Sequence, residues 1–142
     1  MILYHGTNID FDKIELTKSK PNKDFGKGFY LSSDYDQALA MAKVKVEQLE
    51  SGEPMVLAFE VDEVEIEQLN ILRFHEYSEE WAKFILLNRK NDKSQPAHDY
   101  DIVFGLSVGI PNIGGKTKNK YSYKRNGVYI LKEPFLLICF AI

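Results

Sequence analysis

The feature that most constrains the fold of this chain is a capped amphipathic helix flanked by segments typical of β-strands. Asp34 precedes Gln37 by three residues, which is the capping-box pattern that begins a helix. Apolar residues then recur at helical spacing, which predicts a helix from about Tyr35 to Glu50 that ends near Ser51-Gly52. Such a helix must bury its apolar stripe against another layer, and the neighbouring strands are expected to supply it.

The order of the other predicted elements favours a single α+β domain over residues 1–142. A second helix begins at Ser78, with acidic residues in its first turn, where the helix dipole favours them. The nearly continuous apolar run Met55–Val61 is typical of a central strand covered on both faces. Internal repeats and linkers are absent from the sequence, and the order argues against a doubly wound sheet. The other predicted strands are Met1–His5, Phe25–Ser32, Leu69–Phe74, His98–Leu106, Tyr121–Leu131 and Phe135–Ala141.

Composition and charge narrow the functional classes. The net charge is −3, which argues against nonspecific nucleic-acid binding. Basic residues gather from Lys116 onward, where Glu133 is the one acid; a solvated loop explains them more simply than a nucleic-acid-binding tail.

The single cysteine, Cys139, lies in an apolar run, which predicts a buried thiol rather than a nucleophile. The three histidines lack metal-ligand spacing, so no metal is expected. Without a membrane-length apolar run or a signal-peptide pattern, we expect a cytoplasmic protein.

Two short stretches near the N-terminus place recognition groups beside glycines. His5 follows an apolar run and precedes Gly6-Thr7, and Tyr30 follows the turn Gly26-Lys27-Gly28. Glycine lets backbone approach a ligand closely, and flanking strands hold the side chains still. Because side chains alternate along a strand, Phe29 and Leu31 point one way and Tyr30 the other, where its ring offers a flat stacking surface. Taken singly, a structural histidine and a core tyrosine explain these residues equally well.

Taken together, the two stretches resemble the diphtheria-toxin-like branch of the ADP-ribosyltransferases. The sequence Leu-Tyr-His-Gly-Thr is followed about twenty residues later by Gly-Lys-Gly-Phe-Tyr-Leu, then by a capped helix and an apolar strand. The resemblance is greatest to a small family of uncharacterised bacterial and phage proteins placed near the poly(ADP-ribose) polymerases. It covers roughly Met1–Gly105, including Asn70, Leu86–Arg89 and His98–Val103. It implies an ADP-ribosyltransferase-like α+β fold, with antiparallel or mixed sheets, a few flanking helices and a cleft for NAD.

The resemblance also implies a role for each N-terminal residue. His5 would hydrogen-bond the adenine-side ribose of NAD, and the Gly6 backbone would pair with the nicotinamide carboxamide. Thr7 completes this NAD-binding segment, and Tyr30 would stack on the nicotinamide ring. NAD would therefore be bound as a substrate, and ADP-ribose would pass to an unknown acceptor, possibly a protein, or to water in an NAD glycohydrolase.

The third residue of the family pattern, a Glu or Gln at the start of a late strand, is not in its expected place. One register puts Leu137 there and another puts Gly127, and neither side chain stabilises a cation. Glu133 lies in the turn before Pro134 and is the candidate catalytic acid, although a solvated turn residue explains it as well. The Gly-, Lys- and Asn-rich segment after Gly105 indicates a divergent or rearranged C-terminal part. The alternative hypothesis is a catalytically degenerate module that binds NAD or a protein partner.

Overall fold

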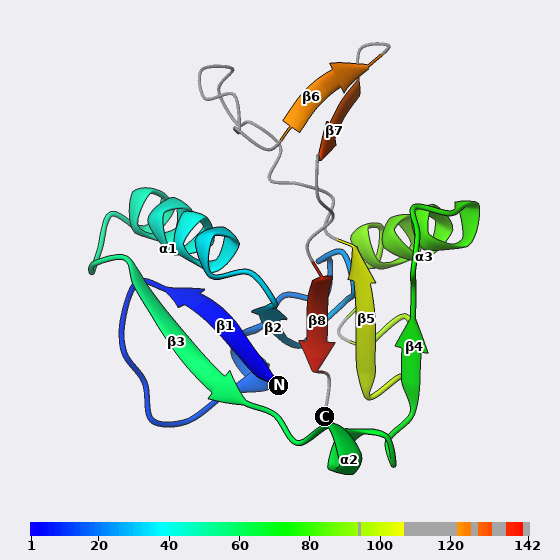
Figure 1. The fold of residues 1–142 in the computed structure, drawn as a ribbon, viewed down its shortest axis with the longest axis horizontal. Helices are drawn as coiled ribbons and strands as arrows, with labels where there is room; N and C mark the ends of the chain where they lie inside the picture. The colour runs from blue at the N-terminus through cyan, green and yellow to red at the C-terminus, as the bar shows by residue number, and fades with distance from the viewer. Residues whose placement is uncertain (94, 107–121, 126–127, 132–135, 141–142) are drawn as a thin grey trace.

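The computed structural model describes residues 1–93 and 95–106 in full and the backbone of residues 122–125, 128–131 and 136–140 (Figure 1). The chain forms a mixed α+β domain with a six-stranded sheet in the order β3-β1-β2-β8-β5-β4 and a separate two-stranded sheet, β6-β7. The strands are β1 (Ile2–Thr7), β2 (Phe29–Ser32), β3 (Met55–Glu60), β4 (Ile71–Arg73), β5 (Ile102–Leu106), β6 (Ser122–Arg125), β7 (Val128–Leu131) and β8 (Leu136–Phe140). The helices are α1 (Tyr35–Leu49), α2 (Glu63–Ile66) and α3 (Glu79–Arg89), with a 3₁₀ turn η1 at Leu16–Lys18.

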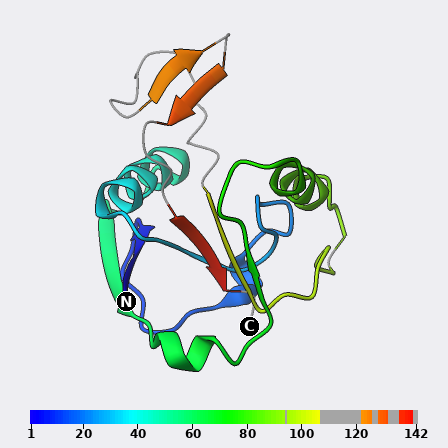
Figure 2. The same cartoon turned by 45° about the vertical axis from the view of Figure 1, so that its right-hand side comes forward.

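Strands that are far apart in the sequence lie side by side in the large sheet. Neighbouring strands run antiparallel, except for β4 and β5, which run parallel. Strand β8 lies in the middle, where it pairs with β2 on one side and with β5 on the other (Figures 1 and 2). The N-terminal strand β1 lies between β2 and β3. His5 and Tyr30, the recognition residues of the two stretches, therefore lie on adjacent strands, β1 and β2.

One face of the large sheet is covered by the two long helices. Helix α1 packs so closely on β1 that a Cβ atom built on Gly6 would lie 1.9 Å from the main-chain oxygen of Ala38. Helix α3 contributes Ile85, which packs with the buried residues Phe25 and Val103. The helix-covered core thus combines a glycine and small alanines under α1 with large side chains under α3.

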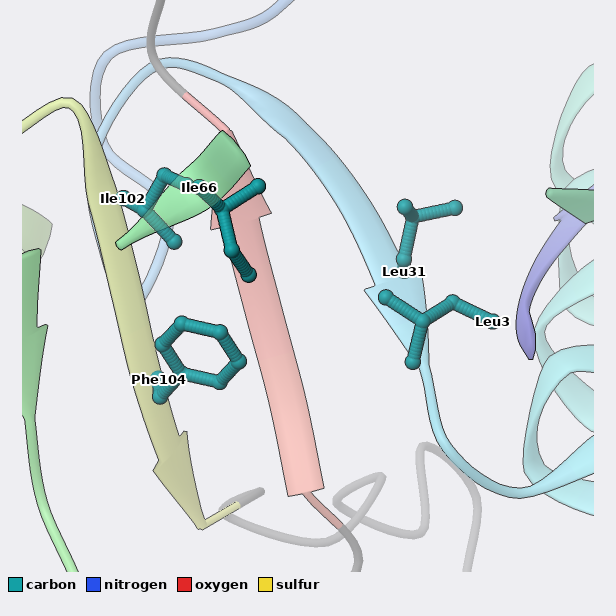
Figure 3. Packing of buried hydrophobic residues seen from close by; sticks show 5 residues of the cluster. All are labelled: Leu3, Leu31, Ile66, Ile102 and Phe104. Atoms are coloured by element: carbon teal, nitrogen blue, oxygen red, sulfur yellow. The ribbon is translucent and has the colours of Figure 1, made fainter. Parts of the chain in front are cut away.

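The other face of the sheet carries the second hydrophobic cluster. Its buried members come from four elements, including the short helix α2 (Figure 3), and are Leu3, Leu31, Ile66, Ile102 and Phe104. Phe29 and Leu31 both belong to this side, whereas Tyr30 packs with the cluster under α3. The predicted alternation along β2 is therefore confirmed.

Local sequence signals account for both long helices. The Asp34 carboxylate accepts a hydrogen bond from the Gln37 amide at 2.7 Å, as the capping box predicts. Ser78 caps α3 by accepting from the Trp81 amide at 3.1 Å. Helix α1 ends at Leu49, one residue before the predicted end, and Glu50 adopts a left-handed conformation.

The strands predicted at Phe25–Ser32 and His98–Leu106 begin four residues later, at Phe29 and Ile102, and two other predicted strands differ in more than their bounds. The apolar run Met55–Val61 predicts a central strand, but β3 lies at the end of the large sheet and is half exposed. An apolar run does not distinguish the two positions, because an edge strand that is covered by a helix also buries apolar side chains. The segment Tyr121–Leu131, predicted as one strand, contains the two paired strands β6 and β7. The dipeptide between them, Asn126-Gly127, is typical of a hairpin turn.

Candidate functional site

The two predicted recognition residues lie where β1 and β2 separate. The two strands share a single register pair, Tyr4 with Ser32. Beyond that pair the link is made by a side chain: His5 Nδ1 lies 2.8 Å from the carbonyl oxygen of Tyr30. The imidazole ring stacks on Phe29, with centroids 4.3 Å apart, and meets the edge of Phe11 at 5.8 Å. His5 is thus positioned by two aromatic rings and a main-chain carbonyl.

The second nitrogen of His5 faces a lysine from helix α1. Because a carbonyl can only accept, His5 Nδ1 carries the proton, and Nε2 is an acceptor. Lys45 Nζ lies 3.3 Å from His5 Nε2 and donates to the carbonyl oxygen of Gly6 at 2.7 Å. Both His5 and the Gly6 carbonyl are therefore engaged with Lys45 in this structure.

Burial and neighbouring cations set the protonation of this pair. Desolvation, assisted by the charges of Lys45 and Lys23, lowers the pKa of His5 to about 4, and the bond to Tyr30 opposes the shift in part. Desolvation and the charge of Lys23 lower the pKa of Lys45 to about 8. At neutral pH the site therefore holds a neutral imidazole beside a largely protonated amine.

Tyr30 is fixed through its hydroxyl group on the helix-covered face. The hydroxyl donates to the Gly26 carbonyl at 2.6 Å and accepts from the Phe25 amide at 3.0 Å. The Phe25 ring lies nearly parallel to the Tyr30 ring, with centroids 6.3 Å apart. The ammonium of the exposed Lys23 lies over the Tyr30 ring, 4.9 Å from its centroid. The ring is thus held rigidly and already carries a cation on its face.

The turn that anchors Tyr30 is held in place by helix α3 and the segment before β5. Gly26 has a φ of +85°, and a Cβ atom there would lie 2.9 Å from Asn88 Oδ1 and 3.2 Å from His98 Nε2. Asn88 is fully buried; its Nδ2 donates to the Phe84 carbonyl at 2.8 Å, while its Oδ1 has no hydrogen-bond partner among the described residues. Asn88 therefore fills the space that a side chain at residue 26 would need.

The structure places the predicted residues in adjacent positions but on different faces of the sheet. His5 shares its face with Phe29, and Tyr30 lies on the opposite face, so the His5 side chain contacts the Tyr30 backbone and not its ring. The closeness of Gly6 to α1 gives that glycine a packing role. Thr7 is buried, and its hydroxyl donates to the Ile9 carbonyl at 2.9 Å. Any ligand of this site would therefore contact the junction of β1 and β2.

The predicted third residue falls largely outside the part of the chain that the structure describes. Glu133 and Gly127 are not among the described residues. Leu137 belongs to β8, where its backbone pairs with Ser32 on one side and Gly105 on the other. In the register that uses Leu137, the late strand of the resemblance is β8, which lies next to β2. Glu133 remains a sequence-based candidate.

Lys45 is the functional candidate that sequence reasoning missed. The spacing of the apolar residues predicts that Lys45 lies on the polar side of the helix with Lys43 and Glu47. However, Ala38, Ala42 and Lys45 stand at i, i+4 and i+7, which places them on one helix face. Both alanines are buried against β1, so this spacing was the signal that could have identified Lys45.

Other candidates have simpler explanations. Arg89 Nε lies 2.6 Å from the Asp24 carboxylate, so this arginine at the end of α3 forms an ion pair. A cavity of about 660 Å³ lies apart from His5 and Tyr30, where α2, β4 and Phe104 meet. Among the residues that the structure describes, His, Cys, Asp and Glu form no group of three able to hold a metal ion. None of the helices in that same part of the chain has the length and apolarity to cross a membrane.

Comparison with known proteins gives a family. The fold is a small α+β domain in which His5 contacts both the Tyr30 carbonyl and Lys45 where β1 and β2 separate. Residues 1–108 match the family model described as protein of unknown function (DUF3990), and the chain belongs to this family. The search of curated proteins and the search of solved structures gave no match.

Proposed function

We propose that this protein binds NAD through the junction of β1 and β2 and is an ADP-ribosyltransferase-like protein. The observation that carries the proposal is the state of Tyr30, whose ring is fixed at its hydroxyl and carries an ammonium group 4.9 Å from its centroid. The nicotinamide ring of NAD is itself a cation, and a tyrosine face attracts cations. In this proposal, nicotinamide takes the place of the flexible, exposed Lys23 side chain on Tyr30.

The hydrogen-bonding groups of β1 support the same ligand. Gly6 offers a carbonyl oxygen, and His5 Nε2 is an acceptor because Nδ1 donates to Tyr30. The carboxamide of nicotinamide carries N–H groups, and ribose carries hydroxyl groups. The ribose hydroxyl would therefore donate to His5, which fixes the direction of the bond that the resemblance implies.

The reaction that we propose is transfer of ADP-ribose from NAD. The bond between nicotinamide and ribose breaks, nicotinamide leaves with the electron pair, and a nucleophile attacks the ribose carbon and loses its proton. Glu133 is the proposed group that stabilises the positive charge developing on the ribose. A second candidate function, NAD binding without chemistry, is favoured by Leu137 in β8 and by the internal partners of both His5 nitrogens.

Calorimetric titration of three Tyr30 variants with NAD measures their affinities and so tests the binding step. Tyr30→Phe keeps the ring, so we expect its affinity to stay within a few-fold of the unmodified protein. Tyr30→Leu and Tyr30→Ala remove the stacking face, and at least a tenfold loss is expected. Circular dichroism checks that each variant is folded. Full affinity in a folded Tyr30→Leu variant would show that the site has been assigned wrongly.

Incubation with NAD that carries a label in its adenylate part distinguishes an enzyme from a protein that only binds NAD. Transfer predicts a labelled product, hydrolysis predicts free ADP-ribose, and both release nicotinamide. Glu133→Ala should abolish that release, and Glu53→Ala, which replaces an exposed acid, is the control. Binding of NAD with neither product nor nicotinamide supports the module without chemistry.

A further inference from the structure

Lys45 is a half-buried ammonium group whose partners among the described residues are neutral. Its Nζ contacts the Gly6 carbonyl oxygen and His5 Nε2, and neither atom carries a negative charge. Within residues 1–93 and 95–106, the ion pairs of lysines and arginines involve Lys18, Arg73, Lys83 and Arg89, and not Lys45. Because an unpaired buried charge is costly, a cation kept in this position points to an anion that arrives with a ligand.

A second cation adds to the positive potential at this junction. Lys23 lies over Tyr30, and its charge acts on both Lys45 and His5. The two lysines therefore approach the junction from the β2 side and from helix α1, in a chain whose net charge is −3. Such a local excess of positive charge attracts a multivalent anion.

The two partners of Lys45 are the acceptor atoms that the proposed NAD complex uses. Gly6 O and His5 Nε2 both accept hydrogen bonds, and Lys45 now supplies the donor to each. A ligand that brings its own N–H and O–H donors makes the ammonium unnecessary there. A lysine has a flexible four-carbon stem and can move its charge to a phosphate nearby.

We propose that Lys45 binds the diphosphate group of the nucleotide ligand and, in doing so, releases Gly6 O and His5 Nε2 to the ligand's own donors. The inference rests on the proposed function and adds to it the residue that reads the phosphates. In the ligand-free protein the ammonium holds the two acceptors in place. In the complex it neutralises the diphosphate.

Binding measurements with three compounds test this assignment. NAD and ADP-ribose contain the diphosphate, and nicotinamide riboside does not. Lys45→Met keeps the length of the side chain and removes the charge, so we expect at least a tenfold loss of affinity for NAD and ADP-ribose and no loss for nicotinamide riboside. Lys43→Met, an exposed lysine on the same helix, should leave all three affinities unchanged. An equal loss for all three compounds, or no loss for any, overturns the proposal.

A second measurement needs no variant and uses inorganic pyrophosphate as the probe. Amine acetylation followed by mass spectrometry should show that pyrophosphate slows modification of Lys45 at least fivefold relative to Lys43. An equal rate with and without pyrophosphate would contradict the proposal. Protection of Lys45 in a protein that fails to bind NAD would refute the proposed function and leave the phosphate site standing.

Discussion

His5 Nδ1 and the Tyr30 carbonyl oxygen, 2.8 Å apart, join β1 to β2 at the point where their ladder ends. A side chain thus takes the role that a main-chain amide would have in a continuous sheet. The bond fixes the imidazole tautomer, and with it the direction of every further contact that His5 makes. It also means that a change at His5 is transmitted to the strand that carries Tyr30.

Acid should destabilise the protein through His5. The folded protein keeps this histidine neutral down to about pH 4, whereas the unfolded chain takes up the proton near pH 6.5. The stability associated with the neutral ring is complete above pH 6.5 and is lost as the pH falls towards 4, by about 3 kcal/mol in total. Denaturant titrations between pH 7.5 and 4 should therefore show a smaller loss in His5→Gln than in the unmodified protein. The exposed His75→Gln is the control, and equal slopes for His5→Gln and the unmodified protein would contradict the prediction.

A methyl group at Gly6 should separate helix α1 from β1. The added carbon would lie 1.9 Å from the Ala38 main-chain oxygen and 2.8 Å from the Ala42 amide nitrogen. Because both are main-chain atoms, the helix itself must move, and Gly6→Ala should cost on the order of 3 kcal/mol in the free energy of unfolding. Adding Ala38→Gly should not restore stability, since the clash is not with a side chain. Ile2→Ala, at an exposed position on the same strand, measures the cost of a simple truncation.

Gly26 and Asn88 should behave as a coupled pair. Gly26→Ala introduces strain at a φ of +85° and a contact of 2.9 Å with Asn88 Oδ1, so we expect a loss of about 2 kcal/mol. Asn88→Ala removes the Oδ1 atom that the new methyl group would clash with. The double variant should therefore lose less free energy of unfolding than the sum of the two single variants. A double-mutant cycle by chemical denaturation measures this coupling. Strict additivity would show that Asn88 does not limit the turn.

Removing the Tyr30 hydroxyl should weaken the turn before β2. In Tyr30→Phe the Phe25 amide and the Gly26 carbonyl both lose a partner, and Phe25 is fully buried. We expect a loss of about 1–2 kcal/mol in the free energy of unfolding. Tyr35→Phe, at an exposed position, provides the comparison. A Tyr30→Phe variant as stable as the unmodified protein would mean that water replaces the hydroxyl.

Local signals in the sequence were sufficient to predict the two long helices and the alternation along β2, but not the short helix α2. Asp34 and Ser78 cap α1 and α3 as predicted, because a cap depends on only a few consecutive residues. The position of β3 at the end of the sheet was not predictable in the same way, since an apolar run shows that a strand is covered without showing its neighbours.

The candidate site was only partly accessible from the sequence. His5, Gly6 and Tyr30 were found as short motifs, and the structure places them on adjacent strands. Lys45 was missed because a charged side chain in a helix is normally assigned to the solvent side, even where its spacing from buried alanines indicates otherwise. The bond between His5 and the Tyr30 carbonyl depends on strand pairing, which no local pattern specifies.

The central place of β8 has a consequence for biosynthesis. Strands β2 and β5 emerge from the ribosome with the gap between them unfilled, and only residues 136–140 pair with both. A nascent chain that stops at β5 therefore exposes two unpaired strand edges in the middle of its sheet, one of them belonging to the strand of Tyr30. We expect the domain to complete its folding late in translation, and we expect premature termination to yield aggregates rather than a smaller working protein.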